Sequence, residues 1–233
     1  NVTTNASADT ATIGGRIRMR ADGGAPGITF NVADGAAATD LLVSAAITEA
    51  SAGLGITKAG AGKMTLTGSN NQSGTTTVNA GTLVAETTGT LGSGNLIVGT
   101  GATCEIRNTA GAIADTAFVS LTGTGKLTLA SGVVETVNRL FVNGVMQAAG
   151  TYTSASSFIT SASSFITGSG SLIVTDTPLV WTSLANGNWS TAANWLNSTV
   201  ADGADNTATF AQATGVTVTL DSNRSIGGLS FAN

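Results

Sequence analysis

Few residues of this sequence could carry out chemistry, and they are scattered along it. Histidine is absent among the 233 residues, which excludes a Ser-His-Asp triad. Asp202 and Asp205 in "VADGADN" form the tightest acidic pair. Calcium takes roughly six to eight oxygen ligands, so two carboxylates in one loop are better interpreted as solvated turn residues. Nothing brings an acid, a base and a nucleophile together, and we expect no catalytic residue, no cofactor and no metal site.

Three tryptophans, Trp181, Trp189 and Trp195, gather in a short span near the end of the sequence. Flat aromatic rings can stack on sugar rings, so these residues form a candidate ligand surface, for example for a cell-surface glycan. Tryptophan also contributes a large apolar area and is usually mostly buried. The alternative interpretation, which we favour, is that the three side chains fill a core or a cap.

The basic cluster of the sequence lies in "GGRIRMRADGG", where Arg16, Arg18 and Arg20 alternate with Ile17 and Met19. In a strand, this alternation puts the arginines on one face and the apolar pair on the other. We interpret the arginine face as solvated, or as a contact for acidic groups of a partner. The chain as a whole has a net charge of -4 and a pI of about 4.6, which does not fit nucleic-acid binding.

The composition favours many short strands over an ordinary globular enzyme. Charged residues make up 9% and hydrophobic residues 42% of the sequence, whereas soluble domains usually carry about 25% charged residues. The apolar residues recur at regular places, unlike those of a disordered chain. The single cysteine, Cys104, alternates in phase with Ile106 and is expected to be buried. No apolar run is long enough to span a membrane, and the richness in Thr, Asn, Ser and Gly fits a bacterial extracellular protein.

A short motif, Gly-x-Gly-x-apolar-x-apolar, recurs along the sequence. It reads "GAGKMTL" from Gly60, "GSGNLIV" from Gly92, "GTGKLTL" from Gly123 and "GSGSLIV" from Gly168. The glycines allow a positive φ at a corner, and the alternation after them gives each strand one apolar face. Frequent corners without a strong hairpin signature favour a β-solenoid, in which each coil buries its apolar face against the next. We expect no helix after the glycines, which argues against a dinucleotide phosphate loop.

The segment "GITKAGAGKMTLTGSNNQSGTTTVNAGTLVAE", from Gly55 to Glu86, resembles the autotransporter-associated β-strand repeat. It departs from the family at Gln72, where the family often has Tyr. "LFVNGVMQAAGTYTSASSFIT" and "WTSLANGNWSTAANW" are similar to segments that recur in the same large bacterial surface proteins. The resemblance implies a right-handed parallel β-helix, secretion to the bacterial cell surface, and a structural or passenger role without catalytic residues.

We predict an all-β chain in three parts. Residues 1–54 match the repeat poorly and form an N-terminal β segment, either the first coils or an assembly strand. Residues 55–176 form the β-solenoid repeats. A boundary is expected at "TDTPLVW", where Pro178 lies. Residues 177–233 form a Trp-containing β segment, for which four arrangements stay open: a continued solenoid, a widened one, a sandwich-like fold, or a contact with the next subunit.

Our leading hypothesis from the sequence is a secreted structural subunit that assembles head-to-tail with copies of itself into an extracellular filament. An open solenoid end exposes unpaired backbone groups, and no cap is evident at either end of the sequence. We expect Val2, Ile226, Leu229 and Phe231 at the contact between copies. Two alternatives are a stalk or passenger segment of a bacterial surface adhesin, and a carbohydrate-binding or polysaccharide-degrading β-helix.

Overall fold

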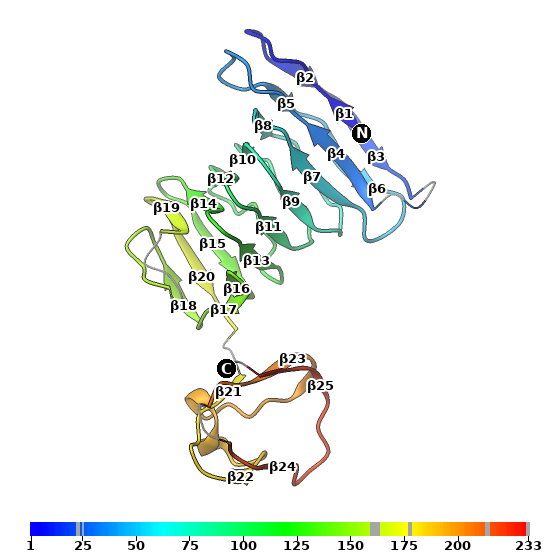
Figure 1. Cartoon of the computed structure of the whole chain (residues 1–233). Coiled ribbons are helices and arrows are strands. Elements are labelled where there is room, and N and C mark those ends of the chain that lie inside the picture. The colour runs from blue at the N-terminus through cyan, green and yellow to red at the C-terminus, as the bar shows by residue number, and fades with distance from the viewer. Residues whose placement is uncertain (22–23, 25, 159–163, 177–178, 213–214, 232–233) are drawn as a thin grey trace. The chain divides into compact units, whose positions relative to one another are not determined.

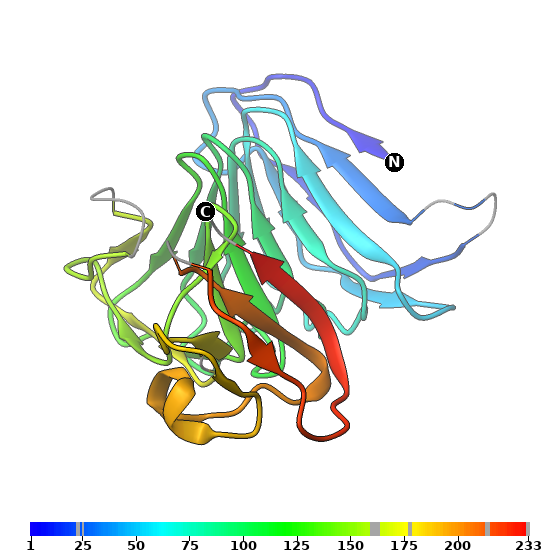
Figure 2. The same ribbon diagram turned by 60° about the horizontal axis from the view of Figure 1, so that its bottom comes forward.

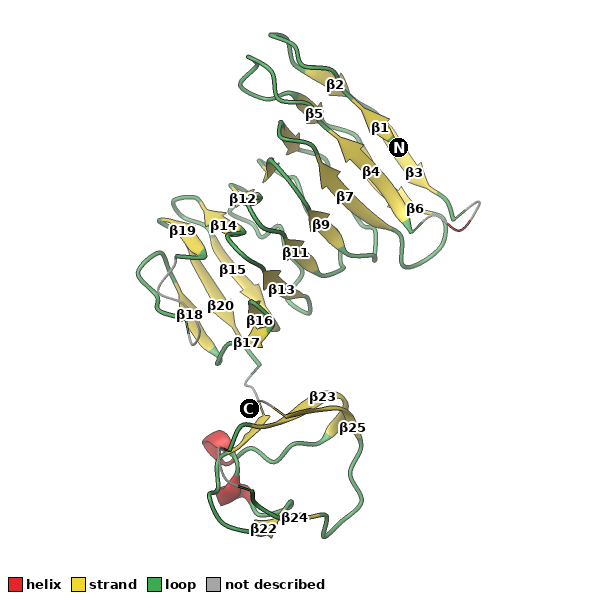
Figure 3. Ribbon diagram, in the orientation of Figure 1, coloured by secondary structure: helices red, strands yellow, loops and turns green. Residues whose placement is uncertain are grey.

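The computed structural model describes residues 1–233 apart from 22–23, 25, 159–163, 177–178, 213–214 and 232–233. The chain divides into two compact units, Asn1–Asp176 and Thr177–Asn233, and each is described by itself. Strands and turns dominate both units, and the helical elements described are short 3-10 turns (Figure 3). The predicted all-β class is confirmed.

Two long sheets form most of the first unit, and the chain contributes strands to them alternately (Figure 1). One has eight strands in the order β1-β4-β7-β9-β11-β13-β16-β17, and the other has seven in the order β19-β14-β12-β10-β8-β5-β2. The strands of the first sheet are β1 (Val2–Thr3), β4 (Gly27–Asn31), β7 (Gly55–Ala59), β9 (Thr76–Val78), β11 (Leu96–Val98), β13 (Phe118–Leu121), β16 (Arg139–Val142) and β17 (Val145–Met146). Those of the second are β2 (Ala11–Ile13), β5 (Leu41–Val43), β8 (Lys63–Leu66), β10 (Thr82–Ala85), β12 (Thr103–Ile106), β14 (Lys126–Leu129) and β19 (Ile166–Gly168).

Shorter sheets form the remaining side of the first unit. One joins β3 and β6, and another has the order β15-β20-β18. Their strands are β3 (Arg16–Met19), β6 (Ala46–Glu49), β15 (Val134–Val137), β18 (Gly150–Tyr152) and β20 (Ser171–Val174). Figure 2 turns the chain and shows the strands of each sheet lying side by side.

Neighbouring strands of the two long sheets run parallel, with β16 and β17 as the exception among the described pairs. The chain returns to the same position after one coil. Hydrogen bonds between neighbouring coils therefore join residues about one coil apart, 28 for Asn1 with Thr29 and 20 for Asn70 with Thr90. This arrangement is the predicted parallel β-helix.

The core lies between the sheets and is made of columns of residues in register. In β7, Ile56 and Lys58 point inward and Thr57 lies between them on the outer side, as alternation in a strand requires. One column of the second sheet consists of Leu41, Met64, Leu83, Cys104, Leu127 and Ile166, all buried. The predicted burial of Cys104 together with Ile106 is confirmed.

Glycines at the corners are required by the closeness of neighbouring coils. Gly81 has a φ of +65°, and a Cβ there would lie 2.5 Å from the carbonyl oxygen of Gly62 and 2.6 Å from those of Ala61 and Gly60. No side chain fits at such distances from backbone atoms. The "GAG" and "NAG" corners of the repeated motif therefore stack directly on each other.

The C-terminal end of the first unit is capped. After β16, the turn at Asn143 and Gly144, both with positive φ, returns the chain as the antiparallel strand β17, and β18 pairs antiparallel with β20. Beneath these strands Phe158 stacks on Tyr152 and meets Phe165 edge-on, with ring centroids 5.7 and 5.5 Å apart. The expectation of no evident cap concerned the start and end of the sequence, and these antiparallel strands at the end of the first unit were not foreseen.

The second unit is a short coil of its own. Its sheets have the orders β21-β23-β25 and β22-β24, and the described pairs are parallel. Within this unit, parallel pairing favours a coil of stacked strands over a sandwich-like fold. The elements are β21 (Leu179–Trp181), β22 (Gly187–Asn188), the 3-10 turns η2 (Ala192–Asn194) and η3 (Leu196–Ser198), β23 (Gly203–Phe210), β24 (Val218–Thr219) and β25 (Ile226–Phe231).

Corner glycines can be required for a positive φ or for the lack of room for a Cβ, and two alanine substitutions separate these two requirements. Gly101 has a φ of +76° but open space where a Cβ would lie, so Gly101→Ala should cost about 1–2 kcal/mol for the left-handed backbone alone. Gly81→Ala should cost about 1–3 kcal/mol more, because backbone of the neighbouring coil must move. Urea unfolding followed by far-UV circular dichroism measures both. Equal losses would show that close coil packing does not select glycine at position 81.

Candidate functional site

The three tryptophans of the second unit lie in its core. Trp181, Trp189 and Trp195 are 0%, 3% and 2% exposed. The ring centroids of Trp181 and Trp195 are 5.3 Å apart, and those of Trp189 and Trp195 are 4.9 Å apart. The ring of Phe210 completes the cluster, 5.7 Å from that of Trp189. These rings fill the core, and they leave almost no exposed surface on which a sugar could stack.

Backbone carbonyls satisfy all three indole N–H groups. They donate to the carbonyl oxygens of Ser183 at 3.0 Å, Ala201 at 2.8 Å and Trp189 at 2.7 Å. Trp195 lies between η2 and η3 and forms an isolated antiparallel bridge with Trp181. The two tryptophans of the "GNWSTAANW" segment are thereby held in the core, and their indole N–H groups donate to backbone carbonyls of the same unit.

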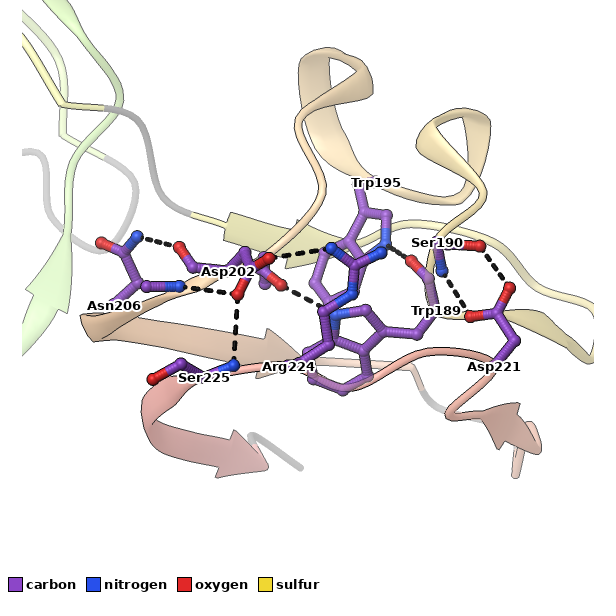
Figure 4. A network of polar contacts seen from close by, with 10 residues as sticks. Trp189, Ser190, Trp195, Asp202, Asn206, Asp221, Arg224 and Ser225 are labelled. Carbon is purple, nitrogen blue, oxygen red and sulfur yellow. Dashed lines mark hydrogen bonds and ion pairs between the residues drawn. The ribbon is translucent and has the colours of Figure 1, made fainter.

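Two carboxylates tie the coils of the second unit together (Figure 4). Asp202 accepts hydrogen bonds from Nη1 of Arg224 at 2.9 Å and from the backbone N–H of Ser225 at 3.2 Å. Asp221 accepts bonds from the backbone N–H of Ser190, at 3.0 Å, and from its hydroxyl. Sequence reasoning missed the second pair, because its members are 31 residues apart and no local pattern joins them.

These hydrogen bonds favour the ionised form of both acids. The bond from Arg224 is the main reason that the pKa of Asp202 lies below its usual value, and the bond from Ser190 does the same for the pKa of Asp221. A carboxylate whose pKa is lowered by folding stabilises the fold above its unfolded pKa and loses that contribution as the pH falls. Their geometry is that of structural clamps between coils.

A metal site is not assembled from the residues that the structure describes. They contain no group of three or more His, Cys, Asp or Glu side chains that could hold an ion. The carboxylate of Asp202 is engaged by Arg224 and Ser225, and the side chain of Asp205 lies outside the described part of the chain. Within the same described residues, no helix has the length and apolar character needed to cross a membrane.

The last coil of the second unit surrounds an apolar hollow of about 430 Å³. Three of its lining side chains, Leu220, Leu229 and Phe231, are 62%, 54% and 73% exposed. The ring of Phe231 stacks on that of Phe210, its partner in the neighbouring strand. Part of the apolar lining of this hollow is therefore in contact with solvent.

The residues predicted at the contact between copies fall in different places. Leu229 and Phe231 line the hollow, and Ile226 is half-buried at the start of β25. Val2 is half-buried in β1, the edge strand of the first unit. The contact between copies stays a prediction.

A buried lysine in the first unit was not foreseen from the sequence. Lys58 is 0% exposed, and its Nζ donates to the carbonyl oxygens of Gly60 at 2.7 Å, Ala59 at 3.0 Å and Ala80 at 3.1 Å. Burial lowers the pKa of Lys58 to about 8, against the opposing effect of Asp40. The ammonium group joins the corners of two neighbouring coils.

Residues 56–85 match the family model of the passenger-associated-transport-repeat. The matched segment falls within the stretch from Gly55 to Glu86 that carried the sequence resemblance, and that prediction is confirmed. The transport repeat spans β7 to β10 almost completely and contains both Lys58 and the Gly81 corner. No curated protein and no solved structure matches the chain.

The burial of the tryptophans leads to a stability prediction. Trp195→Ala should lower the unfolding free energy of the second unit by about 3–5 kcal/mol, because it leaves a cavity among aromatic rings. The matched control is Leu184→Ala, at a side chain that is 79% exposed, for which we expect a change within about 0.5 kcal/mol. All three tryptophans belong to this unit, so tryptophan fluorescence, excited at a wavelength that Tyr152 of the first unit does not absorb, reports on the second unit during urea unfolding. An unchanged midpoint for Trp195→Ala would contradict its place in the core.

Proposed function

We propose that this chain is a structural segment of an autotransporter-type passenger, displayed on the surface of a bacterium. The observation that carries the proposal is the transport repeat at residues 56–85. The same segment builds stacked coils whose corners are joined through Gly81 and Lys58. In this proposal the repeat serves folding and extension rather than catalysis.

The architecture supports a role as an extended support. A solenoid grows in one direction, because each coil contacts only its neighbours, and each coil adds about 4.8 Å. Polar side chains at corners hold adjacent coils together, as with Asp40, whose carboxylate accepts the N–H group of Lys63 in the next coil and that of Gly35 nearby in the sequence. We therefore propose a non-catalytic stalk or passenger segment.

Surface display can be tested with a membrane-impermeant amine reagent on intact cells that produce the full natural protein. Lys126 is exposed and Lys58 is buried, so mass spectrometry should find Lys126 modified and Lys58 unmodified without lysis. An abundant cytoplasmic protein serves as the control for leakage. Modification of Lys126 only after lysis would overturn the proposed location.

A second candidate function is head-to-tail assembly into a filament. The exposed apolar side chains Leu220, Leu229 and Phe231 around the last coil favour it, since an open apolar coil end can accept a strand from another copy. The partner surface in this proposal is the edge of the first unit at β1, which contains Val2. Such head-to-tail contacts extend without closing and give fibres.

Filament assembly predicts concentration-dependent growth of the purified chain. Sedimentation velocity and electron microscopy should show oligomers of the native protein, and the double substitution Leu229→Lys and Phe231→Lys should abolish them by placing two charges in the contact. Leu184→Lys is the matched control, because this exposed leucine does not line the hollow. A native chain that stays monomeric at high concentration rules out this function.

A further inference from the structure

The arginine row of β3 is the part of the surface that the proposed function leaves unexplained. Arg16 and Arg18 are exposed on the outer face, whereas Met19 is buried, and Arg20 follows in the same phase and is exposed. β3 pairs with β6 alone in its described sheet. Alternate residues of a strand are roughly 6.6 Å apart, so Arg16 and Arg18 project from one face of β3 at about this spacing along the backbone.

The other half of the chain's arginines differ from Arg16 and Arg18 in having carboxylate partners. Arg107 pairs with Glu105, Arg139 with Asp176 and Arg224 with Asp202, at nitrogen–oxygen distances of 2.7, 2.5 and 2.9 Å. In the described part of the chain no carboxylate lies within ion-pair distance of Arg16 or Arg18.

Among the described residues, the surface next to these two arginines offers no acid. Arg16 donates to the hydroxyl of Thr48, with Nε 3.4 Å from Oγ1, and Arg18 lies opposite Thr48 in the register of β3 and β6. The acid of β6, Glu49, lies opposite Met19. The two carboxylate oxygens of Glu49 accept the backbone N–H groups of Leu54 and Ser73, each at 3.0 Å. Glu49 is therefore hydrogen-bonded to backbone groups and not to the arginines.

We propose that Arg16 and Arg18 form a binding surface for an anionic polysaccharide. Guanidinium groups bind carboxylate, sulfate and phosphate oxygens through paired hydrogen bonds. Single contacts of this kind are weak at an exposed site, so a small anion that reaches one arginine gains little binding energy. A polymer that carries a charge on successive units engages several arginines at once and gains avidity.

The charge of the whole chain directs such a polymer to this row. The net charge is -4, so most of the surface does not attract a polyanion, while three of the nine basic residues fall within Arg16–Arg20. The choice of a polysaccharide over a nucleic acid rests on the proposed display at the cell surface. The binding itself depends only on the purified chain, so its test is independent of location.

The test compares dextran sulfate with neutral dextran, two polymers that share a backbone and differ in charge. Native chain immobilised on a sensor should bind dextran sulfate at low ionic strength, should not bind dextran, and should lose affinity as salt is added. The double substitution Arg16→Gln and Arg18→Gln should weaken binding at least about 10-fold. Arg107→Gln with Lys126→Gln removes two positive charges elsewhere on the same unit and should weaken it less than about 3-fold.

Three further measurements make the result decisive. Far-UV circular dichroism should be unchanged in both double variants, because all four side chains lie on the surface, and Arg16→Lys with Arg18→Lys should recover part of the lost affinity by restoring charge. Equal binding by the native chain and the Arg16→Gln, Arg18→Gln variant, an equal loss in the control, or no binding at all overturns the proposal. Tighter binding to duplex DNA than to dextran sulfate at the same salt overturns the choice of a polysaccharide.

Discussion

The distance between stacked coils governs the whole first unit. Parallel strands lie about 4.8 Å apart, and each corner must fit into the same spacing as the strands it connects. A carbonyl oxygen 2.5 Å from the position of a Cβ at Gly81 shows how little room remains. Close stacking therefore explains corner glycines such as Gly81, and large side chains are directed into the core or outward from the strands.

Close stacking also leaves some backbone amides, in corners and on strand β6, without a partner strand, and sparse polar side chains accept their hydrogen bonds. Oδ1 of Asn70 accepts the N–H of Ile47, 23 residues earlier, and the carboxylate of Glu135 accepts those of Ala112 and Ile113. Leaving a buried amide unpaired costs about 1–3 kcal/mol. Burial raises the pKa of Glu135 in spite of these bonds. A sequence with 9% charged residues thus uses several of them to hold one coil to the next.

Local alternation made much of the first unit predictable. It gave the strand faces, the burial of Cys104 beside Ile106, and the stack of coils across the transport repeat, because each of these depends on residues close in the sequence. It did not identify Lys58 as buried, since only its contacts with Ala59, Gly60 and Ala80 explain an inward ammonium.

The two ends of the coils were harder to predict. Asn143 and Gly144 form the pair typical of a tight hairpin, so the cap at β17 did leave a local signal, but the packing of Tyr152 and Phe158 beneath it left none. In the second unit, burial of the tryptophans followed from their size, whereas the Asp202 and Asp221 clamps join distant positions in the sequence. Pairing across 22 and 31 residues depends on the coil length, which alternation does not determine.

The antiparallel cap of the first unit has a mechanical consequence. Hydrogen bonds between coils point along the axis of the solenoid. Tension along that axis therefore pulls directly on these bonds and can separate the coils one after another. At the C-terminal end, β17 and β18 bind β16 and β20 as well as covering the aromatic rings below them. Under such tension the coils would peel away from the N-terminal side, and the capped end would be the last to lose its fold.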